Sequence, residues 1–354
     1  MFVRQAAAVG RDRVEGGATM RCHYCEWRCE LGMDRFGVCK MYYSDGEAIR
    51  ERFPRRWCSF GVIGIEAIPF YHVYPGSRCM TIGTSSCNFH CRYCANAFIA
   101  KRDPAEMQDE LLDLTPTDMV KTARKLGCHH IVFNVNEPAV SMDSLRELAR
   151  EAQNAGVTMG CLTNGYTTPE STEILASLFS FFNISLKGLS PEFNREYIGI
   201  PSVEPVLRTI RQLAAIRHVE VATPVIQGVN DHELDEMAGL IAAIDPEIPW
   251  HVFRLLPEDE MRDTPYPNIV SVNSLLEPAR GKLANVYFHN FVGSEWVNTL
   301  CPSCGSVAIE RFSLGCGGDK LQRFLCPGAR CSSCGHTIRL LGDRVAWNDG
   351  GGAQ

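Results

Sequence analysis

Three cysteines at short spacing are the most chemically specific feature of this sequence. Cys87, Cys91 and Cys94 stand in the segment CNFHCRYC, residues 87–94. Thiolates separated by four and three residues can wrap around one face of a cubane iron–sulfur cluster, whereas a closed electron-transfer cluster needs a fourth cysteine. The next residues, ANAF, offer none, so the spacing predicts a cluster with one open iron that can bind a reactant. The alternative is a zinc site made of three cysteines and a nearby histidine such as His90.

A second group of cysteines precedes the first. It consists of Cys22, Cys25, Cys29 and Cys39, with Cys58 further along the chain. Four thiols within 18 residues can close one metal site, which is either zinc or an auxiliary iron–sulfur cluster. A segment this short cannot order itself by burial alone, and structural zinc supplies about 10–16 kcal/mol of apparent binding free energy. The spacing leaves both metals open, and we favour iron–sulfur.

A third group lies near the C-terminus, in two Cys-x2-Cys-Gly segments. Its members are Cys301, Cys304, Cys331 and Cys334. Each turn of this kind delivers two sulfurs to a tetrahedral ion, so the pattern predicts a zinc ribbon. Cys316 and Cys326 lie between the two turns and are either spare thiols or replacements for one turn. Few basic residues accompany the ribbon, which favours a structural cap over a nucleic-acid contact.

Composition limits the class of protein. The chain has 354 residues and 17 cysteines, which is too long and too poor in cysteine for a secreted disulfide scaffold. Clustered thiols without an apolar export signal are typical of metal ligands in a reducing compartment, so we expect a cytoplasmic protein. No apolar run is long enough to span a membrane, and the formal charge of -6 argues against nucleic acid as a partner.

Between the cysteine groups, short apolar runs alternate with amphipathic stretches. We expect strands near residues 80–84, 130–135, 158–163, 181–187, 219–226, 251–256 and 286–289. We expect helices near residues 117–126, 141–155, 169–179, 203–216, 233–244 and 274–282. Thr115 is a suitable N-cap for the first helix, and Gly127 and Gly156 stand where a helix C-terminus favours glycine. This alternation predicts an α/β fold whose parallel sheet is open or closed into a barrel or part of one.

The Cys-x3-Cys-x-aromatic-Cys segment after the first of these strands resembles the signature of the radical SAM superfamily. The resemblance implies a partial (β/α)6 barrel with a [4Fe-4S] cluster held by Cys87, Cys91 and Cys94. In that family the open iron binds S-adenosylmethionine, and one electron cleaves it to methionine and a 5′-deoxyadenosyl radical that abstracts hydrogen from a substrate. An electron donor such as flavodoxin or ferredoxin is then implied as a partner.

The resemblance also implies that several residues bind S-adenosylmethionine. In chain order these are Tyr93, Asn136, Glu137, Pro138, Ser185, Lys187, Asn230, His251 and Arg254. Tyr93 would pack near the adenine, and the Asn-Glu-Pro tripeptide would meet the methionine amino group, although such a tripeptide is also typical of a turn. Ser185 and Lys187 would contact ribose and carboxylate. Active-site groups of α/β barrels gather at the carboxyl ends of strands, where these residues lie.

The arrangement as a whole resembles the AmmeMemoRadiSam branch, which is similar to the activases of glycyl radical enzymes such as pyruvate formate-lyase. The matching stretches are FYHVYPGS at residues 70–77 and NTLCPSCG at residues 298–305. Departures are EAIP at residues 66–69, where a paired-lysine segment is common, and Asn134-Val135, where Thr-Tyr is usual.

These patterns predict five segments. They are a flexible leader (1–19), an N-terminal metal-binding segment (20–76), a radical SAM core (77–292), a zinc-ribbon-like module (293–345) and a flexible tail (346–354). Three functions follow. The first is hydrogen abstraction from a protein or peptide, as in an activase. The second is radical modification of a small molecule or nucleobase. The third is a non-catalytic multi-zinc scaffold, which a metal analysis would distinguish from both enzymes.

Overall fold

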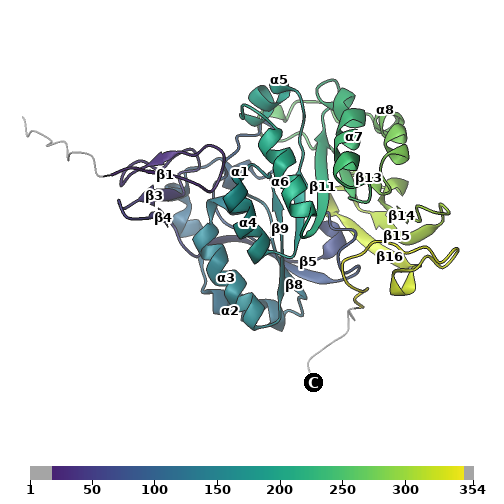
Figure 1. Ribbon diagram of the computed structural model, residues 1–354, viewed down its shortest axis with the longest axis horizontal. Coiled ribbons are helices and arrows are strands. Elements are labelled where there is room, and N and C mark those ends of the chain that lie inside the picture. The colour runs from purple at the N-terminus through teal and green to yellow at the C-terminus, as the bar shows by residue number, and fades with distance from the viewer. Residues whose placement is uncertain (1–17, 347–354) are drawn as a thin grey trace, which may run out of the picture.

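Seven parallel strands form the centre of the molecule in the computed structural model, which describes residues 18–346 (Figure 1). In spatial order they are β6 (Arg78–Gly83), β8 (His130–Phe133), β9 (Thr158–Thr163), β10 (Phe181–Ser185), β11 (His218–Val225), β12 (Trp250–Arg254) and β13 (Val286–His289). Each strand pairs in parallel with the next. The expected α/β barrel is therefore present as an open, curved sheet. The predicted leader up to residue 17 and the tail from residue 347 lie outside the described residues.

Helices link the strands and cover the outer face of the sheet (Figure 1). Their bounds are α1 (Ala97–Ala100), α2 (Pro116–Lys125), α3 (Met142–Asn154), α4 (Pro169–Leu178), α5 (Pro191–Phe193), α6 (Glu204–Ala214), α7 (Leu234–Ile244) and α8 (Ile269–Leu276). The Thr115 hydroxyl caps α2 by accepting the Asp118 amide hydrogen at 3.1 Å, as predicted. Gly127 and Gly156 have φ of +68° and +69°, which confirms their place after helix ends. Helix α8 begins earlier than predicted, because the Asn268 side chain caps it.

The main departure from expectation is a long strand before the first parallel one. Strand β5 (Arg56–Gly64) runs antiparallel to β6 and adds an edge to the sheet, where β7 (Leu112–Asp113) pairs with it. Gly61 and Gly64 interrupt the apolar alternation that would have indicated a strand. A side chain at position 61 would meet the Thr81 hydroxyl at 3.0 Å, so the two strands approach closely there.

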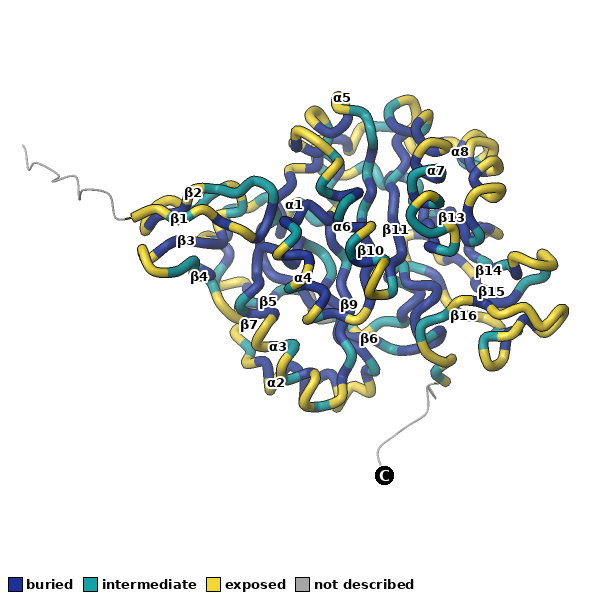
Figure 2. The backbone as a smooth tube through the Cα atoms, in the orientation of Figure 1, coloured by how far each residue is buried: buried dark blue, intermediate teal, exposed yellow. Residues whose placement is uncertain are grey.

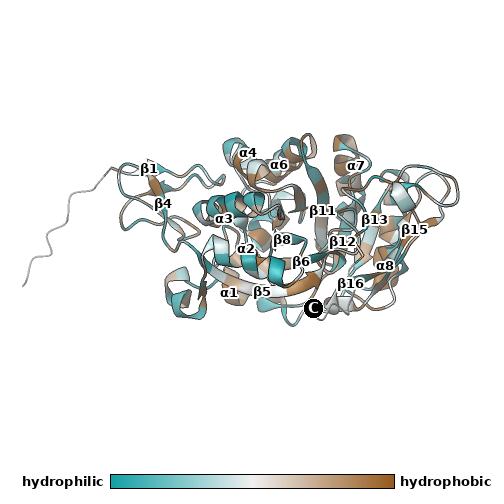
Figure 3. Ribbon diagram, turned by 90° about the horizontal axis from the view of Figure 1, so that it is seen from below, coloured by the Kyte–Doolittle hydropathy of each residue, from teal (hydrophilic) through white to brown (hydrophobic). Residues whose placement is uncertain are grey.

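The cysteine-rich segments lie at opposite ends of the molecule, on either side of the barrel (Figure 3). The N-terminal segment contains two small hairpins, made of β1 (Met20–Arg21), β2 (Glu30–Leu31), β3 (Tyr42–Ser44) and β4 (Ile49–Glu51). The C-terminal segment is a three-stranded antiparallel sheet of β14 (Thr299–Leu300), β15 (Val307–Ser313) and β16 (Asp319–Phe324). In both segments exposed loops surround a small set of buried residues (Figure 2).

Close packing of neighbouring strands explains a glycine inside β9. Gly160 pairs with Phe181 of β10, and a Cβ at position 160 would lie 1.9 Å from the Phe181 ring. Any larger residue would force this ring out of the core. None of the helices within residues 18–346 is both long and apolar enough to cross a membrane.

His130 on β8 makes the stability of this core depend on pH. Its side chain is 3% exposed, and neither ring nitrogen has a hydrogen-bond partner among the described residues. Burial, with a smaller contribution from His129, lowers the pKa of His130 to about 4. Between this pKa and the ordinary value near 6.5, the unfolded chain binds a proton that the folded chain does not. Stability is therefore lost as the pH falls through this window.

We expect His130→Leu to lose less of its free energy of unfolding than the wild type between pH 7 and pH 5. The difference should be about 2 kcal/mol, because leucine removes one of the groups that must become protonated on unfolding. Urea unfolding of both proteins at the two pH values measures it. Equal losses would show that His130 does not contribute to the pH dependence.

Candidate active site

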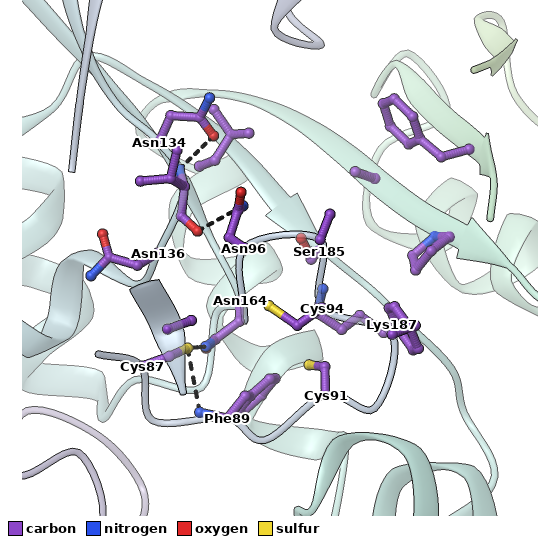
Figure 4. A pocket seen from close by; sticks show the side chains of 18 of the residues that line it. Cys87, Phe89, Cys91, Cys94, Asn96, Asn134, Asn136, Asn164, Ser185 and Lys187 are labelled. Atoms are coloured by element: carbon purple, nitrogen blue, oxygen red, sulfur yellow. Dashed lines mark hydrogen bonds between the residues drawn. The ribbon is translucent and has the colours of Figure 1, made fainter. Parts of the chain in front are cut away.

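A large pocket opens at the carboxyl ends of the parallel strands. It contains about 1240 Å³ of empty space, including its open mouth. Ser185 ends β10, Thr163 ends β9 and Arg254 ends β12, and all three line the pocket. The three cysteines of the first motif line the same pocket (Figure 4). This is the edge of the sheet at which α/β barrels place their chemistry.

Asn136 fixes the start of the cysteine-bearing loop. The loop leaves β6 at Gly83, and the Asn136 side chain accepts the Thr84 amide hydrogen at 3.0 Å. The Nδ2 of Asn136 donates to the Thr84 hydroxyl at 3.0 Å and to the Ser86 carbonyl at 2.9 Å. A side chain at Gly83 would meet Val135 at 2.3 Å. Asn136 is thus a positioning residue for the chain that leads into Cys87.

The loop directs Cys87, Cys91 and Cys94 toward the pocket (Figure 4). Burial raises the pKa of all three thiols. Lys187 and Lys101 oppose this rise at Cys91 and Cys94. No fourth cysteine is among the described residues that line the pocket. Three cysteines beside an open pocket suit a cluster whose fourth iron is open to a ligand.

The geometry does not favour the zinc alternative at this loop. His90 is exposed and does not line the pocket. Among residues 18–346, the groups of three or more His, Cys, Asp or Glu with ligand atoms within 4.8 Å of one another do not include this loop. A single zinc ion would need its ligands at such short separations.

Two polar groups in the pocket wall lack a partner. The Tyr93 hydroxyl and the Arg254 Nε are buried and have no hydrogen-bond partner in the described part of the chain. Lys187 places its ammonium 5.9 Å from the centre of the Tyr93 ring. Buried polar atoms without partners cost free energy, and a polar ligand in the pocket would satisfy them. These observations fit a charged, hydrogen-bonding ligand beside the cysteine loop.

Glu137 lines the pocket, but its carboxylate is engaged by the protein. It accepts hydrogen bonds from the Thr163 hydroxyl at 2.9 Å and from the amides of Asn164 at 2.8 Å and Ala139 at 3.1 Å. Burial raises the pKa of Glu137 to about 7, and the same hydrogen bonds oppose the rise. The carboxylate therefore joins the loop after β8 to the end of β9.

We expect Glu137→Gln to lower the free energy of unfolding by about 1–3 kcal/mol. The new amide NH2 would face a hydrogen-bond donor from which the carboxylate now accepts. Urea unfolding at pH 8 measures this cost. Glu147→Gln on the exposed face of α3 is the matched control and should be neutral. An unchanged stability would mean that the carboxylate does not hold the two loops together.

Several residues expected at the site lie elsewhere. Pro138, Asn230 and His251 do not line the pocket. Asn230 donates to the carbonyl oxygens of Lys187 and Pro224, both at 2.8 Å, so it shapes the loop after β11. His251 is fully buried lower in the barrel, because its strand position turns the ring toward Glu220.

His251 belongs to a buried chain of polar groups below the pocket. Its ring contacts Glu220 at 2.5 Å and His289 at 2.9 Å, and His289 contacts Asp319 at 2.7 Å. The Tyr71 hydroxyl donates to the same Asp319 at 2.6 Å. Tyr71 comes from the FYHVYPGS stretch and Asp319 from β16. This stretch therefore attaches the barrel to the C-terminal module.

Other pocket residues were not predicted from the sequence. Asn164 donates to the Asn88 side chain at 2.7 Å and lies 3.8 Å from the Cys87 sulfur. Asn96 donates to the carbonyl of Val135, whose φ of +71° is strained for a β-branched residue. A polar residue followed by glycine, as in Asn164-Gly165 at the end of a strand, was the signal that could have identified this part of the site.

The C-terminal cysteines form a separate group suited to one metal ion. Cys301, Cys304, Cys331 and Cys334 have sulfurs within 4.8 Å of one another, and two pairs lie at 3.6 and 3.7 Å. Tetrahedral ligands at a Zn–S distance of 2.3 Å would be roughly 3.8 Å apart. Hydrogen bonds from Ser306, with smaller contributions from neighbouring cysteines, lower the pKa of Cys304 to about 6. The group can therefore bind a metal, and Cys316 and Cys326 are not part of it.

The fold and the site define an α/β-barrel protein with a three-cysteine loop at the mouth of the barrel. Residues 81–241 match the model of the Radical SAM superfamily. The chain is a radical SAM enzyme. Membership implies a [4Fe-4S] cluster and S-adenosylmethionine as cofactors. The three cysteines, the pocket beside them and the unpaired polar atoms fit these groups.

Similar curated proteins have different activities. An uncharacterized protein of Methanocaldococcus jannaschii is 27% identical over 91% of this chain and 96% of its own length. A probable GTP 3′,8-cyclase of Thermococcus kodakarensis is 28% identical over 45% of this chain and 51% of its own. The isethionate sulfite-lyase activating enzyme of Oleidesulfovibrio alaskensis is 31% identical over 40% and 48%. The chain spans about half the length of the last two.

Among solved structures, Streptococcus suis SuiB bound to its precursor peptide SuiA is similar over 63% of this chain and 48% of that one. The TM-score is 0.47 and the sequence identity is 13%.

Proposed function

We propose that Cys87, Cys91 and Cys94 hold the [4Fe-4S] cluster and that the pocket beside them binds S-adenosylmethionine. The observation that carries this proposal is the shared pocket, which is lined by the three cysteines together with Tyr93 and Arg254, whose hydroxyl and Nε are unpaired among the described residues. When bound, these groups supply reductive cleavage of S-adenosylmethionine to methionine and a 5′-deoxyadenosyl radical.

The residues of the chain would bind and orient this ligand. Lys187 follows β10 and lines the pocket, and it would pair with the ligand carboxylate. Ser185, Asn134 and Arg254 supply polar groups around the remaining wall. Tyr93 offers both a ring face and a free hydroxyl. The apolar residues Phe253 and Leu255 would exclude water from the reacting end.

For the substrate, we propose a protein or peptide from which hydrogen is abstracted, as in an activase. Similarity to the isethionate sulfite-lyase activating enzyme and the motifs shared with the AmmeMemoRadiSam branch support this choice. The pocket is also open at its mouth, so a chain segment could enter it. Modification of a small molecule or nucleobase is the second candidate, and similarity to a probable GTP 3′,8-cyclase favours it.

The first test is cleavage of S-adenosylmethionine by protein reconstituted without oxygen. We expect 5′-deoxyadenosine and methionine after addition of dithionite. Protein that carries zinc alone at the three-cysteine loop and forms no 5′-deoxyadenosine would support the multi-zinc scaffold instead.

A second experiment distinguishes the substrate classes. Deuterated candidate proteins and deuterated small molecules, including GTP, are incubated separately, and deuterium in 5′-deoxyadenosine is measured by mass spectrometry. Transfer from a protein supports the activase function. Transfer from small molecules only would contradict it.

A further inference from the structure

The four N-terminal cysteines come together around one small cavity, which has about 330 Å³ of empty space including its opening. Cys22, Cys25, Cys29 and Cys39 all line it, and the rest of its wall is mainly apolar. Hairpins hold the thiols there: the Cys22 amide donates to the Cys29 carbonyl at 2.8 Å, and the Val38 amide lies 3.5 Å from the Cys29 sulfur. Four cysteines on one small cavity are a complete ligand set for a metal centre.

The spacing of these sulfurs differs from that of the C-terminal group. Within residues 18–346, no three of the N-terminal thiols lie within 4.8 Å of one another, whereas all four sulfurs of the C-terminal group do. A single ion draws its ligands to the shorter separation. The N-terminal thiols therefore enclose a wider space, which suits a cluster of several metal ions better than one zinc ion.

Asn88 connects this cavity to the loop of the active site. It follows Cys87 directly, is 1% exposed and lines the N-terminal cavity. Its Oδ1 lies 3.8 Å from the Cys87 sulfur, and its side chain also hydrogen-bonds the Cys25 thiol. Trp27 donates its indole hydrogen to the Asn88 carbonyl at 2.8 Å. This hydrogen bond joins the N-terminal cysteine segment to the loop that carries Cys87. The Asn88 side chain therefore lies between a cysteine of the N-terminal group and a cysteine of the active site.

The cavity also reaches the surface. Val38, which lines it, is 52% exposed, and Cys29 and Cys39 are only partly buried. The N-terminal cysteines thus lie close to the surface and contact, through Asn88, the loop that holds Cys87.

We propose that Cys22, Cys25, Cys29 and Cys39 bind a second [4Fe-4S] cluster, through which electrons enter the active site. Its role rests on the proposed function, whereas its presence does not. A reduced flavodoxin or ferredoxin gives one electron to this cluster, and the cluster passes the electron to the centre at Cys87, Cys91 and Cys94. The donor is oxidised by one electron, and no bond in the N-terminal centre forms or breaks.

Metal content tests the site separately from catalysis. The triple variant Cys87→Ala, Cys91→Ala, Cys94→Ala, reconstituted without oxygen, should still hold about four irons and show a reduced-cluster EPR signal with dithionite. The wild type should hold about eight. A triple variant that contains no iron, or zinc in place of iron at the N-terminal cysteines, would overturn the proposal even if the wild type cleaves S-adenosylmethionine.

The relay is tested with Cys25→Ala, and Cys58→Ala serves as the matched control because Cys58 does not line the cavity. For each protein, 5′-deoxyadenosine formation is measured with dithionite and with reduced flavodoxin. In Cys25→Ala, the flavodoxin-driven rate relative to the dithionite-driven rate should fall at least tenfold, and in Cys58→Ala the ratio should stay at the wild-type value. An unchanged ratio in Cys25→Ala would refute electron entry through this centre.

Discussion

Cys91→Ala is expected to lower the rate of 5′-deoxyadenosine formation by about 1000-fold or more, because two thiolates and a methyl group cannot retain a cluster with one open iron. The iron content should fall by about four atoms per chain. Cys91 is buried and lines the pocket, so the loss of iron and of activity would both arise at this site. Iron analysis and product chromatography on the same anaerobic sample measure both effects.

Cys128→Ala is the matched control for this variant. Cys128 is 8% exposed, so the two cysteines are similarly buried, but it does not line the pocket. This control should retain the iron and the activity of the wild type. Cys91→Ala protein that keeps both would show that the cluster is held elsewhere and would remove the basis of the proposed site.

The elements of the barrel could be predicted from sequence because each leaves a local signal. Apolar runs predicted the bounds of β9 and β13 as the structure has them. The capping residue Thr115 marks the start of α2 as expected. Strand β5 could not be predicted, because its glycines remove the alternation and its partner strand is supplied by the fold. Its existence depends on tertiary pairing.

Side-chain direction limits what the sequence could predict about the site. His251 and Arg254 lie on one strand, yet only Arg254 reaches the pocket, because His251 lies further from the carboxyl end and is bound by Glu220 and His289. Asn136 and Glu137 are at the expected place, but their side chains engage the protein rather than open space. The roles of Asn88 and Asn164 depend on contacts between distant loops, which no short motif encodes.

Cys304→Ala should remove the metal of the C-terminal group and unfold that module. The module has a small buried cluster, and structural zinc supplies about 10–16 kcal/mol of apparent binding free energy, so losing one of four ligands removes much of what orders it. The Arg311 guanidinium donates to the Tyr71 carbonyl at 2.7 Å, and Tyr71 in turn bonds Asp319, so unfolding would also expose the base of the barrel. Limited proteolysis and zinc analysis measure these effects.

Cys316→Ala provides the comparison, because Cys316 is an exposed cysteine in the same module and lies outside the metal-binding group. It should keep the metal content of the wild type and wild-type resistance to protease. If Cys316→Ala loses the metal as Cys304→Ala does, the four cysteines with sulfurs within 4.8 Å of one another are not the complete ligand set. Loss of the metal from Cys304→Ala without loss of protease resistance would instead mean that packing alone orders this module, through the contacts of Tyr71 and Arg311 with the barrel.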